Sequence, residues 1–318
     1  MRAATLLLLF CLTLCLPAPS AGAERHISAS VYPVWLLLRQ VAGGVPGVRV
    51  GLVLPAGTGC PHDYALAPQD RKALARTDIL VVNGLGLESF LGHDGSAMLS
   101  LLKPGACIID VSQGVEGLLP AEGAQPHPGQ PHDGDGRAHA EGRRHGHWNP
   151  HIFAAPSMMA AMALSLGEQL AALDPANAAL IRGNARLCHS RLMDLARECA
   201  GAGSRTAGKH ILAQHDIFSY LARDLGLVID GFLQADEDAA PSAHDLLALA
   251  RTARERGTAA VVTEPQYPGR AGMALARECG IPCVEIDPVA SGPVDAPADY
   301  YEQTMRRNLR LLEGTLGK

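Results

Sequence analysis

The sequence predicts an α/β protein with two parallel-sheet lobes that are joined by one long backbone helix. Short apolar runs rich in β-branched residues alternate with segments in which apolar residues recur at i, i+3 and i+4, and this alternation is typical of parallel α/β layers. One unusually long helical pattern separates the strands into two groups. The chain has 318 residues, of which 47% are hydrophobic, so two lobes can each bury a core.

The chain begins with a segment typical of an export signal. Arg2 precedes an apolar run over residues 3–16, and small residues follow as far as Ala23. The run is too short to span a bilayer comfortably, and no other window approaches the length of a membrane span. We therefore expect a signal peptide over residues 1–23 and an exported protein without a stable membrane anchor.

Seven apolar runs are predicted as strands, four before the long helix and three after it. The helix is expected over residues 173–203, with Asp174 as its N-cap, Pro175 at its first position and Gly203 at its end. This division gives an amino-terminal lobe over residues 24–172 and a carboxy-terminal lobe over residues 204–318. The predicted strands begin at His26, Val48, Asp78, Cys107, His210, Ala259 and Pro282.

Residues 121–147 interrupt the alternation. They contain no Val, Ile, Leu, Met or aromatic residue, so this tract cannot contribute to a core and is expected to be disordered. A His-rich tract is typical of weak metal binding, although a solvated linker has the same composition. Five of the chain's 13 histidines lie in it: His127, His132, His139, His145 and His147.

Side chains that bind metals follow four of the predicted strands. His62, His215, Glu264 and Asp287 lie where parallel α/β folds place their ligands, outside the carboxyl ends of strands, and His151 in the stretch HWNPHIF is a further candidate. Three imidazoles and a carboxylate suit tetrahedral Zn²⁺. The sequence therefore predicts a metal site in the cleft between the lobes, although each histidine taken alone is as consistent with a surface or capping role.

Several linked motifs, in the same order, resemble the exported zinc-binding receptors of bacterial ABC transporters, in the wider family that also serves manganese. HDYALAPQD resembles the first metal loop of the family, NPHIF the second, and QHDIFSYLARDLGL the third. EPQYPG and EIDPV resemble the last two loops, and DPANAALIRGNA resembles the start of the long helix. The resemblance covers nearly the whole mature chain.

The resemblance implies that His62 and His151 bind one zinc ion tightly from the amino-terminal lobe and that His215 and Asp287 bind it from the other lobe. Manganese-type members usually carry a carboxylate at the position of His215, and nitrogen there favours zinc. Glu264 is implied to orient an imidazole rather than to bind the metal. The implied protein is a periplasmic monomer that delivers zinc to an ABC membrane permease, with further weak sites in the His-rich tract.

The chain departs from the family pattern at two positions. Cys60 stands where members often have an acidic residue, and its thiolate could bind zinc or form a disulfide, since six cysteines remain after export into an oxidising compartment. Asn149 replaces the common Asp before Pro150, and a neutral amide orients an imidazole less strongly than a carboxylate does.

Other functions can be weighed against the zinc receptor. A net charge of −5 without a basic stripe argues against nucleic-acid binding. A secreted zinc hydrolase would use His62, His151 and His215 with bound water and Glu264 as the base, but a site closed by Asp287 leaves no open position for water, so we expect no enzyme. A manganese-type receptor would have the same fold, as would a periplasmic adhesin or zinc buffer in which the His-rich tract matters more than the cleft.

Overall fold

The computed structural model of the chain describes residues 24–59, 61, 64–92, 95–121, 147–234 and 241–317, and its strands form two four-stranded sheets. All neighbouring strands within each sheet are parallel, which confirms the predicted α/β fold class. The first sheet has the order β2 (Val48–Leu52), β1 (Arg25–Ala29), β3 (Ile79–Val82) and β4 (Cys107–Asp110). The second has the order β6 (Val228–Phe232), β5 (His210–Ala213), β7 (Ala260–Thr263) and β8 (Cys283–Glu285).

The helices lie around and between the two sheets. Those before the second sheet are α1 (Tyr32–Val41), α2 (Pro68–Leu74), α3 (Gly95–Ser100), α4 (Pro156–Leu173) and α5 (Ala178–Thr206). Those after β5 are α6 (Ser219–Asp224), α7 (Ala243–Arg256), α8 (Arg270–Cys279) and α9 (Tyr300–Leu316). Short 3-10 turns occur at η1 (Ser89–Leu91), η2 (Ile152–Ala154) and η3 (Asp216–Phe218). Within these described ranges, no helix has the length and apolar character that a membrane crossing requires.

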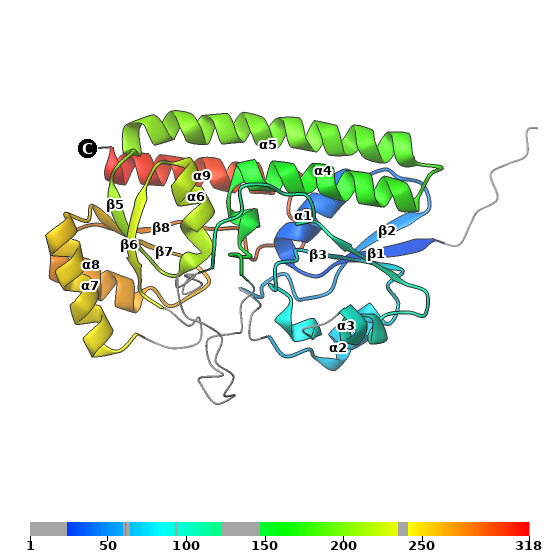
Figure 1. The fold of residues 1–318 in the computed structure, drawn as a ribbon, viewed down its shortest axis with the longest axis horizontal. Helices are drawn as coiled ribbons and strands as arrows, with labels where there is room; N and C mark the ends of the chain where they lie inside the picture. Colours follow the sequence, from blue (N-terminus) through cyan, green and yellow to red (C-terminus); the bar gives the residue numbers. More distant parts are fainter. Residues whose placement is uncertain are drawn as a thin grey trace, which may run out of the picture.

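The long helix α5 runs along the whole molecule, above one sheet and then the other (Figure 1). α4 and α9 pack against it from the two ends. Its bounds differ from those that the sequence predicts, because Asp174 is the C-cap of α4, Asn177 is the N-cap of α5, and the helix continues past Gly203 to Thr206. Gly203 serves close packing instead, since a Cβ there would lie 3.2 Å from the backbone of Leu225.

The strand β6 was not predicted from the sequence. Its five residues, VIDGF, include an Asp and a Gly, two residues that are depleted in strands, and it forms an edge of the second sheet with only β5 as its neighbour. Such a strand depends on pairing with its neighbour for its stability, so the local sequence gives a weak signal for it.

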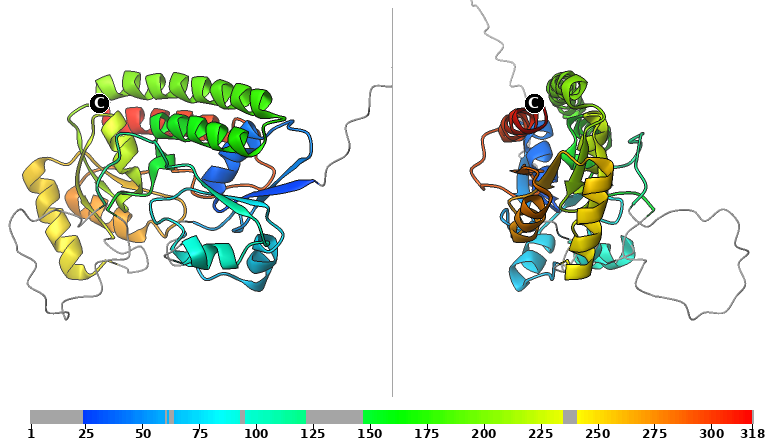
Figure 2. Two further views of the ribbon diagram at one scale, coloured as in Figure 1. Left: turned by 45° about the vertical axis from the view of Figure 1, so that its right-hand side comes forward. Right: turned by 90° about the vertical axis from the view of Figure 1, so that its left-hand side faces the viewer.

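One hydrophobic core extends across both sheets. It includes Ile27 and Leu80 from the first sheet, Ile211 and Val262 from the second, and Leu192 from α5 between them. The views in Figure 2 show how closely α4, α5 and α9 cover the two sheets. A shared core of this kind resists a wide separation of the two halves, because opening them would expose buried apolar surface to water.

The prediction of a disulfide is not confirmed. The five cysteines in the described ranges are free thiols: Cys107, Cys188, Cys199, Cys279 and Cys283. Cys188 and Cys199 are both buried on α5 and are too far apart along one helix to bridge each other. Burial raises the pKa of each of these two thiols to about 12, so they behave as inert core residues. Cys60 and the predicted signal peptide at residues 1–23 lie outside the described residues.

Candidate metal centre

His151 is held in a turn that the sequence Asn149-Pro150 forms between the first sheet and α4. Its side chain is 2% exposed, and its backbone N–H donates a hydrogen bond of 2.8 Å to Asn149 Oδ1. Asn83, which follows β3, donates a hydrogen bond of 2.9 Å from Nδ2 to the carbonyl of Pro150. These two hydrogen bonds hold the turn that carries His151. Phe153 packs edge-on against the imidazole, with ring centroids 6.0 Å apart.

His215 and Glu264 meet because they follow neighbouring parallel strands. Ala213 of β5 pairs with Val262 of β7, so the residues beyond these two strands emerge at the same edge of the sheet. Nδ1 of His215 lies 2.6 Å from Oε1 of Glu264, with side chains that are 3% and 0% exposed. Apart from this contact with His215, the described residues give the oxygens of Glu264 no hydrogen bond. A buried carboxylate in this position requires a positive partner nearby, either a protonated imidazole or a bound cation.

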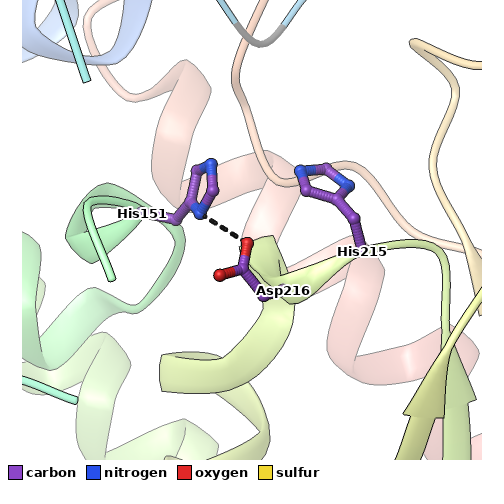
Figure 3. A group of neighbouring side chains, drawn as sticks. All are labelled: His151, His215 and Asp216. Carbon is purple, nitrogen blue, oxygen red and sulfur yellow. Dashed lines mark ion pairs between the residues drawn. The ribbon is translucent and has the colours of Figure 1, made fainter. Parts of the chain in front are cut away.

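The two imidazoles come together with a carboxylate that the sequence did not single out. His151, His215 and Asp216 each offer an atom within 4.8 Å of the others, and the two imidazole rings are 5.3 Å apart between centroids. Oδ1 of Asp216 lies 3.1 Å from Nδ1 of His151 (Figure 3). The sequence contained one signal for Asp216: an acidic residue stands directly after a candidate ligand in a chain whose Asn149 lacks the usual carboxylate.

Each imidazole presents its Nδ1 edge to a carboxylate. Proton placement follows from this arrangement, since a nitrogen that faces an acceptor oxygen must carry the proton. The lone pair then lies on Nε2 of both rings, and in Figure 3 the nitrogen of His151 farther from Asp216 is on the opposite edge of the ring. Imidazoles oriented in this way by carboxylates are suited to bind a divalent metal through Nε2.

Asp287, which follows β8, is not among these three residues. Its Oδ1 accepts hydrogen bonds from the backbone N–H of Val289, at 2.8 Å, and from Nε2 of Gln266, at 3.1 Å. Its Oδ2 lies 3.8 Å from a guanidinium nitrogen of Arg307. The side chain is nearly buried at the carboxyl end of its strand, but its oxygens are not among the atoms that the structure brings within 4.8 Å of both imidazoles.

His62 and Cys60 lie outside the described residues, but the chain on either side of them is described. Gly59 contacts Gln266, since a Cβ on Gly59 would lie 3.3 Å from Cβ of that side chain. Tyr64 Oη donates a hydrogen bond of 2.8 Å to Asp70 Oδ2, which also accepts from the backbone N–H that precedes α2. Gly59, three residues before His62, thus lies beside Gln266, the partner of Asp287.

The His-rich tract is described only at its ends. Ala121 donates a backbone hydrogen bond of 3.2 Å to His147, which is exposed, and Pro120 forms an antiparallel bridge with Trp148. The two ends of the tract are therefore adjacent in space. The remaining histidines of the tract lie outside the described residues: His127, His132, His139 and His145.

Two sets of known proteins resemble the chain over most of its length. The sequence model of the family described as "Zinc-uptake complex component A periplasmic" matches residues 27–314. The high-affinity zinc uptake system protein ZnuA of Yersinia pestis is 25% identical, over 94% of this chain and 95% of its own length. The zinc-binding protein AdcA of Streptococcus pyogenes is 25% identical over 93% of this chain, which spans 56% of that longer protein.

A solved structure shares the fold. The solute-binding protein FpvC from Pseudomonas aeruginosa, in complex with Mn²⁺, superimposes with a TM-score of 0.74 at 23% identity, and the match covers 92% of this chain and 98% of FpvC. At this level of identity the likeness concerns the arrangement of the two sheets and the helices, while the chemistry of the site follows from the residues described above.

Proposed function

The chain belongs to the ZnuA family of periplasmic zinc-uptake components, and on that premise we propose that it is a periplasmic high-affinity zinc receptor that delivers Zn²⁺ to an ABC membrane permease. Relatives whose names state zinc uptake or zinc binding support this proposal. In this function the ion is cargo: the protein must bind it tightly, protect it from water and other ligands, and release it to a partner.

The observation that carries the proposal is the pair of buried imidazoles. His151 reaches the site from the part of the chain that precedes α4, and His215 reaches it from the second sheet, so a metal bound by both would bridge the two halves of the molecule. Their Nδ1 edges face Asp216 and Glu264. The negative charge of these two carboxylates favours a cation over a neutral or anionic solute at this position.

The proposed ligands are Nε2 of His151, Nε2 of His215, His62 and the carboxylate of Asp287. Gly59, three residues before His62, contacts Gln266, and Gln266 hydrogen bonds to Asp287. This chain of contacts supports the inclusion of His62 and Asp287 with the two imidazoles. Three nitrogen donors and one oxygen donor suit Zn²⁺ better than Mn²⁺, which prefers oxygen ligands.

A closed set of four ligands suits transport rather than catalysis. A catalytic zinc site keeps one position for water or substrate, whereas four protein ligands saturate a tetrahedral ion. A zinc hydrolase would require Asp287 to stay away from the metal and Glu264 to act on a bound water. Glu264 is instead in contact with His215 at 2.6 Å, as a residue that orients the imidazole would be.

Calorimetric titration of the mature protein with Zn²⁺ and with Mn²⁺ tests the proposal. We expect one tight zinc site per chain and weaker binding of manganese. Tight binding of manganese with little preference for zinc would favour a manganese-type receptor of the same fold. Hydrolytic activity that depends on added zinc would favour the enzyme instead.

A further inference from the structure

We propose that Asp216 is a positioning residue for His151 and supplies the carboxylate that Asn149 lacks. The inference rests on the proposed binding of zinc by His151, and it concerns how this particular chain prepares that imidazole. It does not follow from the family resemblance, which places the orienting acid immediately before Pro150.

The contacts around Nδ1 of His151 carry the argument. This nitrogen forms a hydrogen bond of 3.0 Å with Oδ1 of Asn149 and lies 3.1 Å from Oδ1 of Asp216. Both oxygens are acceptors, so they hold the proton on Nδ1 and leave the metal-binding lone pair on Nε2. A charged acceptor strengthens this arrangement and makes the imidazole a better ligand than an amide does alone.

Asn149 and Asp216 also form hydrogen bonds with each other. The Asn149 amide has a defined orientation, because its Oδ1 accepts from the backbone N–H of His151 while its Nδ2 donates to the Asp216 carbonyl, at 2.9 Å, and to Asp216 Oδ2, at 3.2 Å. A carboxylate at position 149 would bring its oxygens against these two acceptors. The site therefore favours one carboxylate beside His151, and in this chain the turn η3 after β5 provides it.

The position of Asp216 argues that it acts through His151 rather than as a metal ligand. Its Oδ1 lies on the Nδ1 edge of the ring (Figure 3). Asn149 already forms a hydrogen bond with the same nitrogen. A metal at Nε2 binds on the opposite edge of the imidazole. If Oδ1 of Asp216 shared an ion with Nδ1 of His151, the hydrogen bond from that nitrogen to Asn149 would be lost.

Variants at the two positions test the inference. We would compare wild type, Asp216→Asn, Asn149→Asp and the double variant N149D/D216N, with Asp295→Asn as the control because Asp295 is an exposed acid outside the site. Zinc affinity would be measured by competition with a chelator. The proton position on His151 would be read from the ¹⁵N chemical shifts of the imidazole in the metal-free protein.

We expect D216N to weaken zinc binding by about 10- to 100-fold, as the loss of a partner that orients a ligand usually does. N149D should also bind more weakly than wild type, because it places two carboxylates together. The double variant should bind more tightly than either single variant, and the control should match wild type. In metal-free D216N, protonation at Nε2 of His151 should appear, because an amide at position 216 can donate to Nδ1.

Two outcomes would overturn the inference. D216N could leave both the affinity and the proton position unchanged. Alternatively, D216N could remove tight binding as completely as His215→Ala does, with no recovery in the double variant, which would make Asp216 a ligand. A wild-type protein that binds no zinc would refute the proposed function instead, and the ¹⁵N shifts of the metal-free protein would still decide whether Asp216 positions His151.

Discussion

Oε1 of Glu264 lies 2.6 Å from Nδ1 of His215, and both side chains are almost completely buried. The pair joins the ends of β7 and β5 and orients the imidazole so that Nε2 carries the lone pair. Since the described residues give Glu264 no hydrogen bond besides its contact with His215, its charge must be balanced within the site itself. We therefore expect Glu264 to contribute to the proposed metal binding rather than to the stability of the fold.

Replacement of Glu264 by Gln should therefore weaken zinc binding without lowering the stability of the metal-free protein. We expect the zinc affinity of Glu264→Gln to fall by about 10- to 100-fold, because a neutral amide orients and polarises His215 less strongly. The metal-free protein should lose no stability, since the buried charge is removed while the shape is kept. Competition titration and urea unfolding of the metal-free protein measure the two effects.

The matched control for this variant is Glu285→Gln. Glu285 ends the adjacent strand β8 but is exposed, so its replacement should leave zinc affinity unchanged. A large loss of metal-free stability in Glu264→Gln would contradict this interpretation and would show that Glu264 supports the fold.

Packing of α4 against α5 leads to a prediction about stability alone. A Cβ on Gly167 of α4 would lie 2.3 Å from Cβ of Ala185 on α5, so the two helices can approach this closely only with glycine there. Gly167→Ala should lower the free energy of unfolding by about 1–3 kcal/mol, the usual cost of overpacking.

Gly183→Ala is the corresponding control on α5. Gly183 is exposed, and a Cβ there would meet nothing within 4 Å, so alanine should raise stability by about 0.5–1 kcal/mol through its better helix propensity. Equal effects of the two substitutions in thermal unfolding would show that α4 and α5 can move apart at little cost.

Comparison of individual elements explains why the sequence predicts some features and not others. Buried strands such as β3, ILVV, carry a local signal because all their residues are apolar. The closeness of His151 and His215 could be expected because both lie in recognisable loops. For Asp216 the sequence gives only its place directly after His215, since its role depends on a contact with His151 that only the folded chain creates.

The ends of helices α4 and α5 are also hard to predict from the sequence. Asp174 and Pro175 have the residue types that begin a helix. In the structure, however, Asp174 is the C-cap of α4. Its Oδ2 accepts a hydrogen bond of 2.8 Å from Nδ2 of Asn177. A cap residue can serve either helix in a short connection, so tertiary packing decides between them. The predicted ligand His62 and most of the His-rich tract lie outside the described residues and remain predictions.

Glu88 gives the protein a pH-dependent stability. It is buried, accepts hydrogen bonds from Ser30, Asn83 and Gly84, and burial raises the pKa of its carboxyl to about 7. Between the ordinary pKa of a glutamic acid and this raised value, the folded state holds a proton that the unfolded state has lost. The free energy of unfolding contributed by Glu88 should therefore decrease as the pH rises from about 4.5 to 7 and stay low above that.

Urea unfolding at pH 5 and pH 8 tests this prediction. Wild type should lose more stability between the two values than Glu88→Gln, because glutamine does not ionise. The effect bears on the site, since Asn83 connects Glu88 to the carbonyl of Pro150 beside His151. An identical change with pH in the two proteins would show that Glu88 does not titrate in this range.

The proposed cleft site and the His-rich tract can be separated by truncation. His215→Ala and Asp287→Ala should each weaken tight zinc binding strongly, because each removes a proposed ligand. Replacement of residues 121–147 by a short linker should weaken it little, and such a linker can close the chain because Pro120 and Trp148 are paired in an antiparallel bridge. Titration calorimetry on the three variants measures the affinity and the number of ions bound.

The truncated protein should keep one tight ion and lose only weak binding, since a tract without apolar anchors cannot hold its histidines in a fixed geometry. Loss of the tight ion on truncation would place the principal site in the tract and would refute the assignment to His151 and His215.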